Sequence, residues 1–215
     1  MVPFRYREQS YVNALQWSIG LEIFLQVRDP WRIVLTTDHP NGAPFTSYPH
    51  LMRLLMDKPF RDEQLARLHP EVAAQSALKH MTRELTLNEI AVMTRAAPAR
   101  LLGLADRGQL GVGAAADIAV YREEGDAETM FGRPAWVLKD GVPVVRDGRV
   151  VATPAGAVHV AQPAFDAAIE KTIAAHTDRP LGLAPRHAVI GPDELCRCCN
   201  PNGRILPSAC LPRSV

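Results

Sequence analysis

The sequence lacks cysteine over its first 195 residues, and all four cysteines lie between Cys196 and Cys210. A disulfide framework spreads its bridges over the fold, so this clustering excludes one. Structural zinc sites use C-x₂₋₄-C pairs, whereas the Cys-Arg-Cys-Cys run at 196–199 has a different spacing. We therefore expect the Cys196–Cys210 tail to carry free thiols and no metal.

A surplus of either charge is also missing, because 24 Lys and Arg residues balance 23 Asp and Glu residues to a net charge of +1. This balance removes the electrostatic reason to expect a nucleic-acid or anionic-membrane partner. No apolar run approaches the roughly 18 residues of a membrane-spanning helix. The first residues contain no apolar stretch of the kind found in secretory signals. We expect a cytoplasmic protein.

Two motifs that carry chemistry in other proteins are absent. The seven histidines form neither a His-x-His nor a His-x-x-x-His pair. The glycines Gly108, Gly111 and Gly113 are not followed by Lys-Ser/Thr and precede a predicted strand, so they do not form a phosphate-binding loop.

The first third of the chain predicts a helix, a strand and a polar loop. Residues 10–27 place Val12, Leu15, Ile19 and Ile23 at helical spacing, which predicts an amphipathic helix. Residues 31–37 are aromatic and β-branched between two prolines and predict a buried strand. This order of elements is typical of a parallel α/β fold.

The next segment, from 48 to 104, predicts helices in pieces: 50–56, 61–68, 71–81 and 87–104. The pattern Thr86-x-x-Glu89 is a capping box and predicts a helix start there.

From residue 105 the composition changes to glycines and short β-branched runs, which predicts a small β-module over 105–152. Two Asp-Gly pairs, at 140–141 and 147–148, are flanked by β-branched runs and indicate tight antiparallel turns. Beyond it, residues 163–176 predict a helix, and the chain past Asp178 has an irregular composition. The predicted division is 1–104, 105–152 and 153–215.

The proportions of these elements indicate an incomplete architecture. A (β/α)₈ barrel takes about 250 residues, and this chain offers one buried parallel strand. One strand cannot form a parallel sheet, so the sequence has the character of the end of a larger protein.

Asp38 is the leading candidate for chemistry because it directly follows the predicted strand, where parallel α/β proteins place catalytic groups. A simple turn role for Asp38 is the alternative, since Asp before Pro-Asn-Gly is common turn chemistry. His39 is a ligand or substrate-contact candidate. Neighbouring residues on an extended chain point in opposite directions, so His39 should face the wall if Asp38 faces the site, unless the loop has already turned.

Two stretches of sequence carry a resemblance to a known family. Residues 98–104, with Arg107-Gly108-x-Leu110 and Ala116-Asp117-Ile118, resemble the C-terminal signature of the amidohydrolase superfamily. The run 36–50, together with 2–6 and 11–17, is similar to the family of formylmethanofuran dehydrogenase A subunits. Within that family it is most similar to the version in the formyltransferase/hydrolase complexes of methylotrophic bacteria.

The resemblance implies an α/β fold: the C-terminal end of an amidohydrolase (β/α)₈ barrel, with its last strand and helices, plus a small β-sandwich module. It implies a site of two zinc ions, with Asp38 as the last metal ligand and the catalytic proton acceptor, and with His39 and Asn41 contacting substrate. The other zinc ligands are absent from this chain. The implied reaction is hydrolysis of N-formylmethanofuran to formate and methanofuran, or its reverse. The implied partners are the other subunits of the complex.

Two alternatives remain open. One is another amidohydrolase, of the D-aminoacylase or dihydroorotase kind, and the long match over 38–49 argues against it. The other is a truncated, non-catalytic structural protein of the complex.

Overall fold

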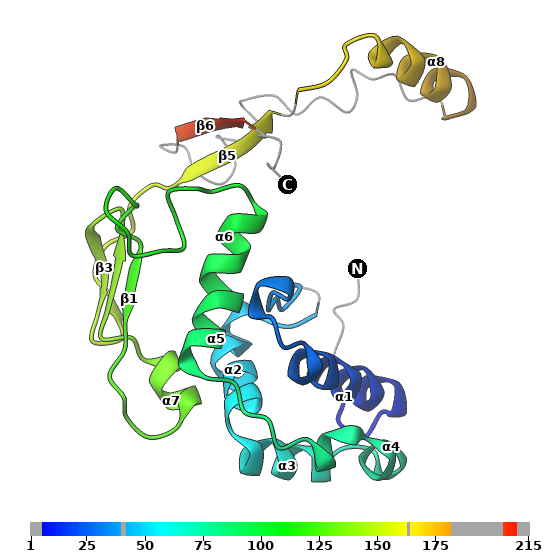
Figure 1. The fold of residues 1–215 in the computed structure, drawn as a ribbon, viewed down its shortest axis with the longest axis vertical. Coiled ribbons are helices and arrows are strands. Elements are labelled where there is room, and N and C mark those ends of the chain that lie inside the picture. The colour runs from blue at the N-terminus through cyan, green and yellow to red at the C-terminus, as the bar shows by residue number, and fades with distance from the viewer. Residues whose placement is uncertain (1–5, 40–41, 163, 182–203, 210–215) are drawn as a thin grey trace. The chain divides into compact units, whose positions relative to one another are not determined.

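The computed structural model describes residues 6–39, 42–162, 164–181 and 204–209, and the chain divides into two compact units, Met1–Ala152 and Thr153–Val215 (Figure 1). The first unit contains, in chain order, α1 (Tyr11–Gln26), η1 (Pro30–Arg32), η2 (Phe45–Ser47), α2 (Tyr48–Met56), α3 (Lys58–Ala66), α4 (Pro70–Gln75), η3 (Ala77–His80), α5 (Leu87–Ala91), η4 (Val92–Ala96), α6 (Ala97–Leu101), β1 (Ile118–Val120), α7 (Ala127–Gly132), β2 (Trp136–Lys139), β3 (Val142–Arg146) and β4 (Arg149–Val150).

Helix α1 forms where the sequence predicts it, but it packs through a different face. Its buried side chains are Ala14, Ser18, Leu21 and Leu25, and the helix contacts α2, α4 and η3. The four residues that the spacing assigned to the apolar face are exposed. Because α1 is apolar on nearly every side, periodicity could not show which face meets the core of this chain.

The strand predicted over 31–37 is not formed. Pro30–Arg32 is a 3₁₀ turn, capped by the Asp29 carboxylate, which accepts a hydrogen bond from the Trp31 N–H at 3.1 Å. Residues 33–38 belong to no sheet, although Leu35 and Thr37 are buried. A parallel strand exists only through backbone hydrogen bonds to a neighbouring strand, and the described residues supply no such neighbour.

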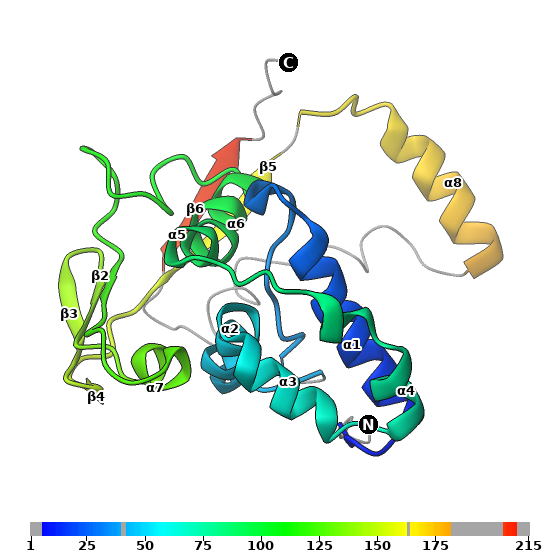
Figure 2. The same cartoon turned by 60° about the horizontal axis from the view of Figure 1, so that its bottom comes forward.

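The helices between Tyr48 and Leu101 pack with α1 around the main apolar core, and α2 and α3 lie beside each other in it (Figure 2). Arg61 of α3 is fully buried there, and its guanidinium donates to the carbonyls of Leu54 at 2.8 Å and Arg83 at 3.0 Å. Burial lowers the pKa of Arg61, against the opposing pull of the Asp62 carboxylate. Arg61 thus fixes the loop that leads to α5.

The predicted capping box at the start of α5 is confirmed, since Thr86 and Glu89 exchange both hydrogen bonds. The helix that follows continues to Leu101 and contains the π turn η4. At the end of this turn the Ala97 N–H donates a hydrogen bond to the Val92 carbonyl, five residues earlier. This wider turn accommodates Pro98, which has no N–H to donate.

Strands β1 to β4 form one antiparallel sheet in sequence order, so the predicted meander is confirmed. Asp140 and Asp147 have φ of 49°, and the glycine after each also has positive φ. Positive φ at both central residues defines the hairpin turn that matches strand twist.

The residues that carry the amidohydrolase signature form a charge network beside this sheet. The carboxylate of Asp117 accepts from the Arg107 guanidinium and from Lys139 Nζ at 2.9 Å. It also accepts from the backbone N–H of Asp140 at 2.8 Å. Gly108 lies so close to the preceding helix that an added Cβ would stand 2.7 Å from the Ala99 methyl. The signature therefore has a structural purpose, joining the helix end to the sheet.

The second unit contains strand β5 (Ala157–Gln162), which pairs in parallel with β6 (Arg204–Ala209), and helix α8 (Ile169–Leu181). The helix confirms the one predicted near 163–176, although it begins and ends later. The two strands were not predicted. All four cysteines of the Cys196–Cys210 tail lie outside the described residues. No helix in the described part of the chain has the length and apolar character to cross a membrane.

Candidate functional site

Asp38 lies in a tightly closed loop. The Gly42 N–H donates to the Asp38 carbonyl at 2.8 Å, and the Ala43 N–H donates to the Thr37 carbonyl at 2.9 Å. Asp38 itself has φ of 51°, a left-handed conformation that costs a non-glycine residue of the order of 1 kcal/mol. Asp38 is exposed, and its Oδ2 atom lies 3.5 Å from the place that a Cβ on Gly42 would take.

Gly42 makes this closure possible. A Cβ at position 42 would stand 2.8 Å from the Thr37 carbonyl oxygen and 3.1 Å from the Asp38 Cβ. Any larger residue would push the loop away from Asp38. Asp38 is therefore held by its own backbone and by a glycine that no other residue can replace without a shift.

His39 follows Asp38 but does not face a buried wall, because the chain has already turned at the positive φ of Asp38. Its Nδ1 accepts a hydrogen bond from the Phe45 N–H at 3.3 Å, and the two rings meet edge to face at 4.7 Å. The imidazole is exposed. Asn41, the other predicted substrate contact, lies outside the described residues.

The described residues bring no metal-binding group of three or more His, Cys, Asp or Glu side chains together. His50 is near Glu128, with Nδ1 at 3.3 Å from the carboxylate. Asp38 has no histidine or second carboxylate bonded to it among the interactions of the described part. Among the described residues, Asp38 is thus a single exposed carboxyl group with no second metal-ligand type of side chain bonded to it.

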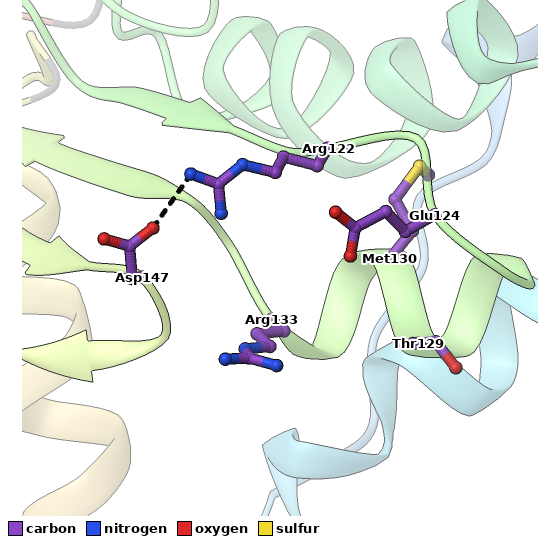
Figure 3. A pocket seen from close by; sticks show the side chains of 6 residues that line it. All are labelled: Arg122, Glu124, Thr129, Met130, Arg133 and Asp147. Atoms are coloured by element: carbon purple, nitrogen blue, oxygen red, sulfur yellow. Dashed lines mark ion pairs between the residues drawn. The ribbon is translucent and has the colours of Figure 1, made fainter.

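A separate pocket of about 240 Å³ lies between α7 and the turns of the sheet, and sequence reasoning missed it (Figure 3). Arg122 pairs with Asp147 at 3.0 Å across its mouth. The remaining lining residues are Glu124, Thr129, Met130 and Arg133. Two guanidinium groups face two carboxylates, so the pocket is electrically balanced, and it contains no nucleophile activated by a base.

The same fold and signature occur in proteins of known class. The model of the amidohydrolase family matches residues 1–152, and the chain belongs to that family. Members of the family are generally metal-dependent hydrolases.

Within the family, the similarity is specific. The chain is 48% identical over 171 residues to the A subunit of the formyltransferase/hydrolase complex Fhc of Methylorubrum extorquens, covering 80% of this chain and 31% of that protein. It is 46% identical over 159 residues to protein FwdA of Methanocaldococcus jannaschii, covering 70% and 28%. An N-acyl-D-glutamate deacylase of Alcaligenes xylosoxydans xylosoxydans is 48% identical over 52 residues, 24% of this chain.

A solved structure shares the fold. It is the crystal structure of the formyltransferase/hydrolase complex FhcABCD from Methylorubrum extorquens in complex with methylofuran. One of its chains matches 98% of this chain with a TM-score of 0.82 at 42% identity. This chain covers 38% of that one. The chain thus spans about a third of the length of the relatives it matches.

Proposed function

We propose that this chain forms the C-terminal portion of an A subunit of the formyltransferase/hydrolase type, in an enzyme that hydrolyses N-formylmethanofuran to formate and methanofuran or runs the reverse reaction. The observation that carries the proposal is the match of 98% of the chain, at a TM-score of 0.82 and 42% identity, to a chain of the complex that holds methylofuran. The other subunits of such a complex are its proposed partners.

The proposed cofactor is a pair of zinc ions in the complete enzyme. The residues that the structure describes do not fit such a centre alone, because they bring no three His, Cys, Asp or Glu side chains together, and zinc takes about three protein ligands. The remaining ligands would come from the part of the domain that this chain does not match. Isolated, the chain should neither hold two zinc ions nor release formate.

The proposed role of Asp38 is that of a proton acceptor and of one metal ligand. In hydrolysis, a water oxygen forms a bond to the formyl carbon and the carbon–nitrogen bond breaks. The Asp38 carboxylate takes the proton from the water and passes it to the leaving amine nitrogen, which departs as methanofuran. A carboxylate performs this only within hydrogen-bond reach of both atoms. The closed, strained loop is suited to hold it in one place.

His39 and Asn41 are proposed substrate contacts in the same loop. The Nδ1 atom of His39 is occupied by the Phe45 N–H, which leaves Nε2 as the atom available to a substrate.

The test is a chimera in which this chain replaces the matching part of the Methylorubrum extorquens A subunit inside the FhcABCD complex. We expect the chimera to release formate and Asp38→Asn to lower its turnover by about 10²–10⁴-fold, the effect of losing a general base. His39→Asn should do much less. Asp29→Asn, the same change at the cap of η1, is the matched control and should leave turnover within about twofold.

Metal content of each purified variant separates the two roles of Asp38. Loss of metal in Asp38→Asn marks a ligand, and retained metal with lost turnover marks the proton acceptor. Full turnover in a folded Asp38→Asn chimera would overturn the site. An inactive wild-type chimera that assembles normally would favour a non-catalytic structural role. Release of a different acyl group would favour another amidohydrolase, for which the short match to the deacylase is the supporting observation.

A further inference from the structure

The outer face of α1, which we define as Val12, Leu15, Ile19 and Ile23, is apolar and uncovered. These four side chains are 59%, 37%, 46% and 51% exposed, on a helix whose opposite side is buried in the core of the chain. A helix side with this many aliphatic side chains is normally covered by another element. The outer face therefore has no packing partner among the residues that the structure describes.

The charges of α1 support this interpretation. Glu22 is the one charged residue among its sixteen. Its Oε1 atom is engaged in hydrogen bonds on the buried side of the helix. It accepts from the Ser18 hydroxyl at 3.0 Å, the Ser76 hydroxyl at 2.9 Å and the Ala77 N–H at 2.9 Å. The outer face is left with no charge. By contrast, α3 carries Lys58, Asp62 and Glu63 outside the core among its nine residues, as a helix with one side facing water does.

The absence of a charged rim favours one kind of occupant. Contacts between separate proteins that form and dissociate are rimmed by polar and charged groups. The exposed Gln16 and Gln26 lie on the same side of α1 as these four residues, and neither carries a charge. A mainly aliphatic face without charged side chains is instead typical of packing inside one domain. A second copy of this chain would meet α1 over one helix face, less than the 1,200 Å² or so that stable dimers bury.

We propose that the outer face of α1 packs against the part of the amidohydrolase domain that this chain does not match. This chain covers 38% of the similar chain in the FhcABCD structure, so most of that chain remains to supply the cover. The inference rests on the proposed function, which supplies the identity of the domain. Its test measures the melting temperature and does not depend on formate release.

The experiment compares one pair of substitutions in two contexts. Ile19→Glu with Ile23→Glu is made in the full 215-residue chain and in the chimeric FhcABCD complex. In the isolated chain the face is already solvated, so the pair should change the melting temperature by no more than about 1 °C. In the chimera it would bury two carboxylates among apolar groups, and the melting temperature should fall by about 5–10 °C.

The matched control is Ile169→Glu with Ile173→Glu in α8. These isoleucines have the same spacing and similar exposure, 47% and 48%. They should have the same small effect in both contexts. Circular dichroism checks that each variant keeps its helix content.

Three results would overturn the proposal. The first is an α1 pair that is neutral in the chimera, because the face is then not covered there. The second is an equal fall in both contexts, because the cover then comes from within the chain. The third is a dimer of the isolated chain that the α1 pair dissociates, because a second copy is then the occupant. If the chimera is inactive but the α1 pair still lowers its melting temperature more than that of the isolated chain, the proposed hydrolase function fails and the packing proposal stands.

Discussion

The helices between Tyr11 and Leu101 bury a continuous apolar core, whereas no residue of strands β1 to β4 is buried. In the β-module, residues 105–152, the one buried apolar residue is Ala135. The module is held by its two Asp-Gly turns and by the charge network around Asp117. Neighbouring regions of one unit are thus stabilised in different ways: the helices by desolvation, the sheet by hydrogen bonds and ion pairs at its surface.

The largest effect should come from the helical core. Leu55→Ala removes a fully buried side chain and should lower the free energy of unfolding by about 2–5 kcal/mol, because the cavity it leaves collapses only in part. Val145→Ala in β3 is the matched truncation in the β-module and should cost less than about 1 kcal/mol, since Val145 is only half-buried. Urea denaturation of both variants measures the difference. Equal losses would mean that the sheet is buried as deeply as the helices.

A smaller effect should come from the charge network. Burial raises the pKa of Asp117, but the Asp140 N–H and the Lys139 ammonium outweigh it and hold that pKa below its ordinary value. The stability that Asp117 gives is therefore present above the pKa of the unfolded state, near 3.9. It is lost as the pH falls through the lower folded pKa. Asp117→Asn should cost about 1–2 kcal/mol at pH 7 and nothing at acid pH.

Trp136 of β2 reports on the module when Trp17 and Trp31 are replaced by Phe. Its fluorescence melts, compared for Asp117→Asn and the parent protein from pH 7 down to about pH 2, follow this loss through the lower folded pKa. The pH dependence should weaken in the variant, and the part that remains belongs to other carboxylates such as Asp140, whose pKa Lys139 also lowers. A variant that keeps the slope of the parent would show that another carboxylate carries it.

The smallest effect should come from the cap of α5. Thr86→Ala removes the hydroxyl that accepts the Glu89 N–H at 3.2 Å and should cost about 1 kcal/mol. Thr86→Ser keeps the acceptor and should cost only a few tenths. Thermal melts of the two variants provide the comparison, and identical melting temperatures would show that the capping box adds no stability.

Features set by neighbouring residues were predictable from the sequence. The Asp-Gly hairpins and the capping box depend on a few consecutive residues, and both are present. The strand over 31–37 depends on backbone partners that the described chain does not provide, so composition alone predicted it wrongly. The buried face of α1 depends on which side the rest of the chain meets, and a helix apolar all round carries no local signal for that. The pairing of β5 with β6 joins segments far apart in the sequence.

The candidate site likewise has features that the sequence could predict and features that only the structure reveals. The position of Asp38 at the end of an extended segment followed from residue order. Its positive φ and its dependence on Gly42 follow from loop closure, which no pattern of residue types encodes. The pocket between Arg122 and Asp147 arises where a helix and a hairpin turn meet, and only the structure could place those residues together.

The π turn between α5 and α6 has an evolutionary consequence. One additional residue in a helix rotates everything beyond it by about 100°, and here that rotation sets Ala97 and Ala99 against their neighbours after Ile90 and Met93 have met the core. A single codon gained or lost in this segment would therefore misalign one half of the helix with its surroundings, even if every buried side chain were kept. Selection on this helix must therefore preserve the number of residues between Met93 and Ala97 as well as the identity of the buried side chains.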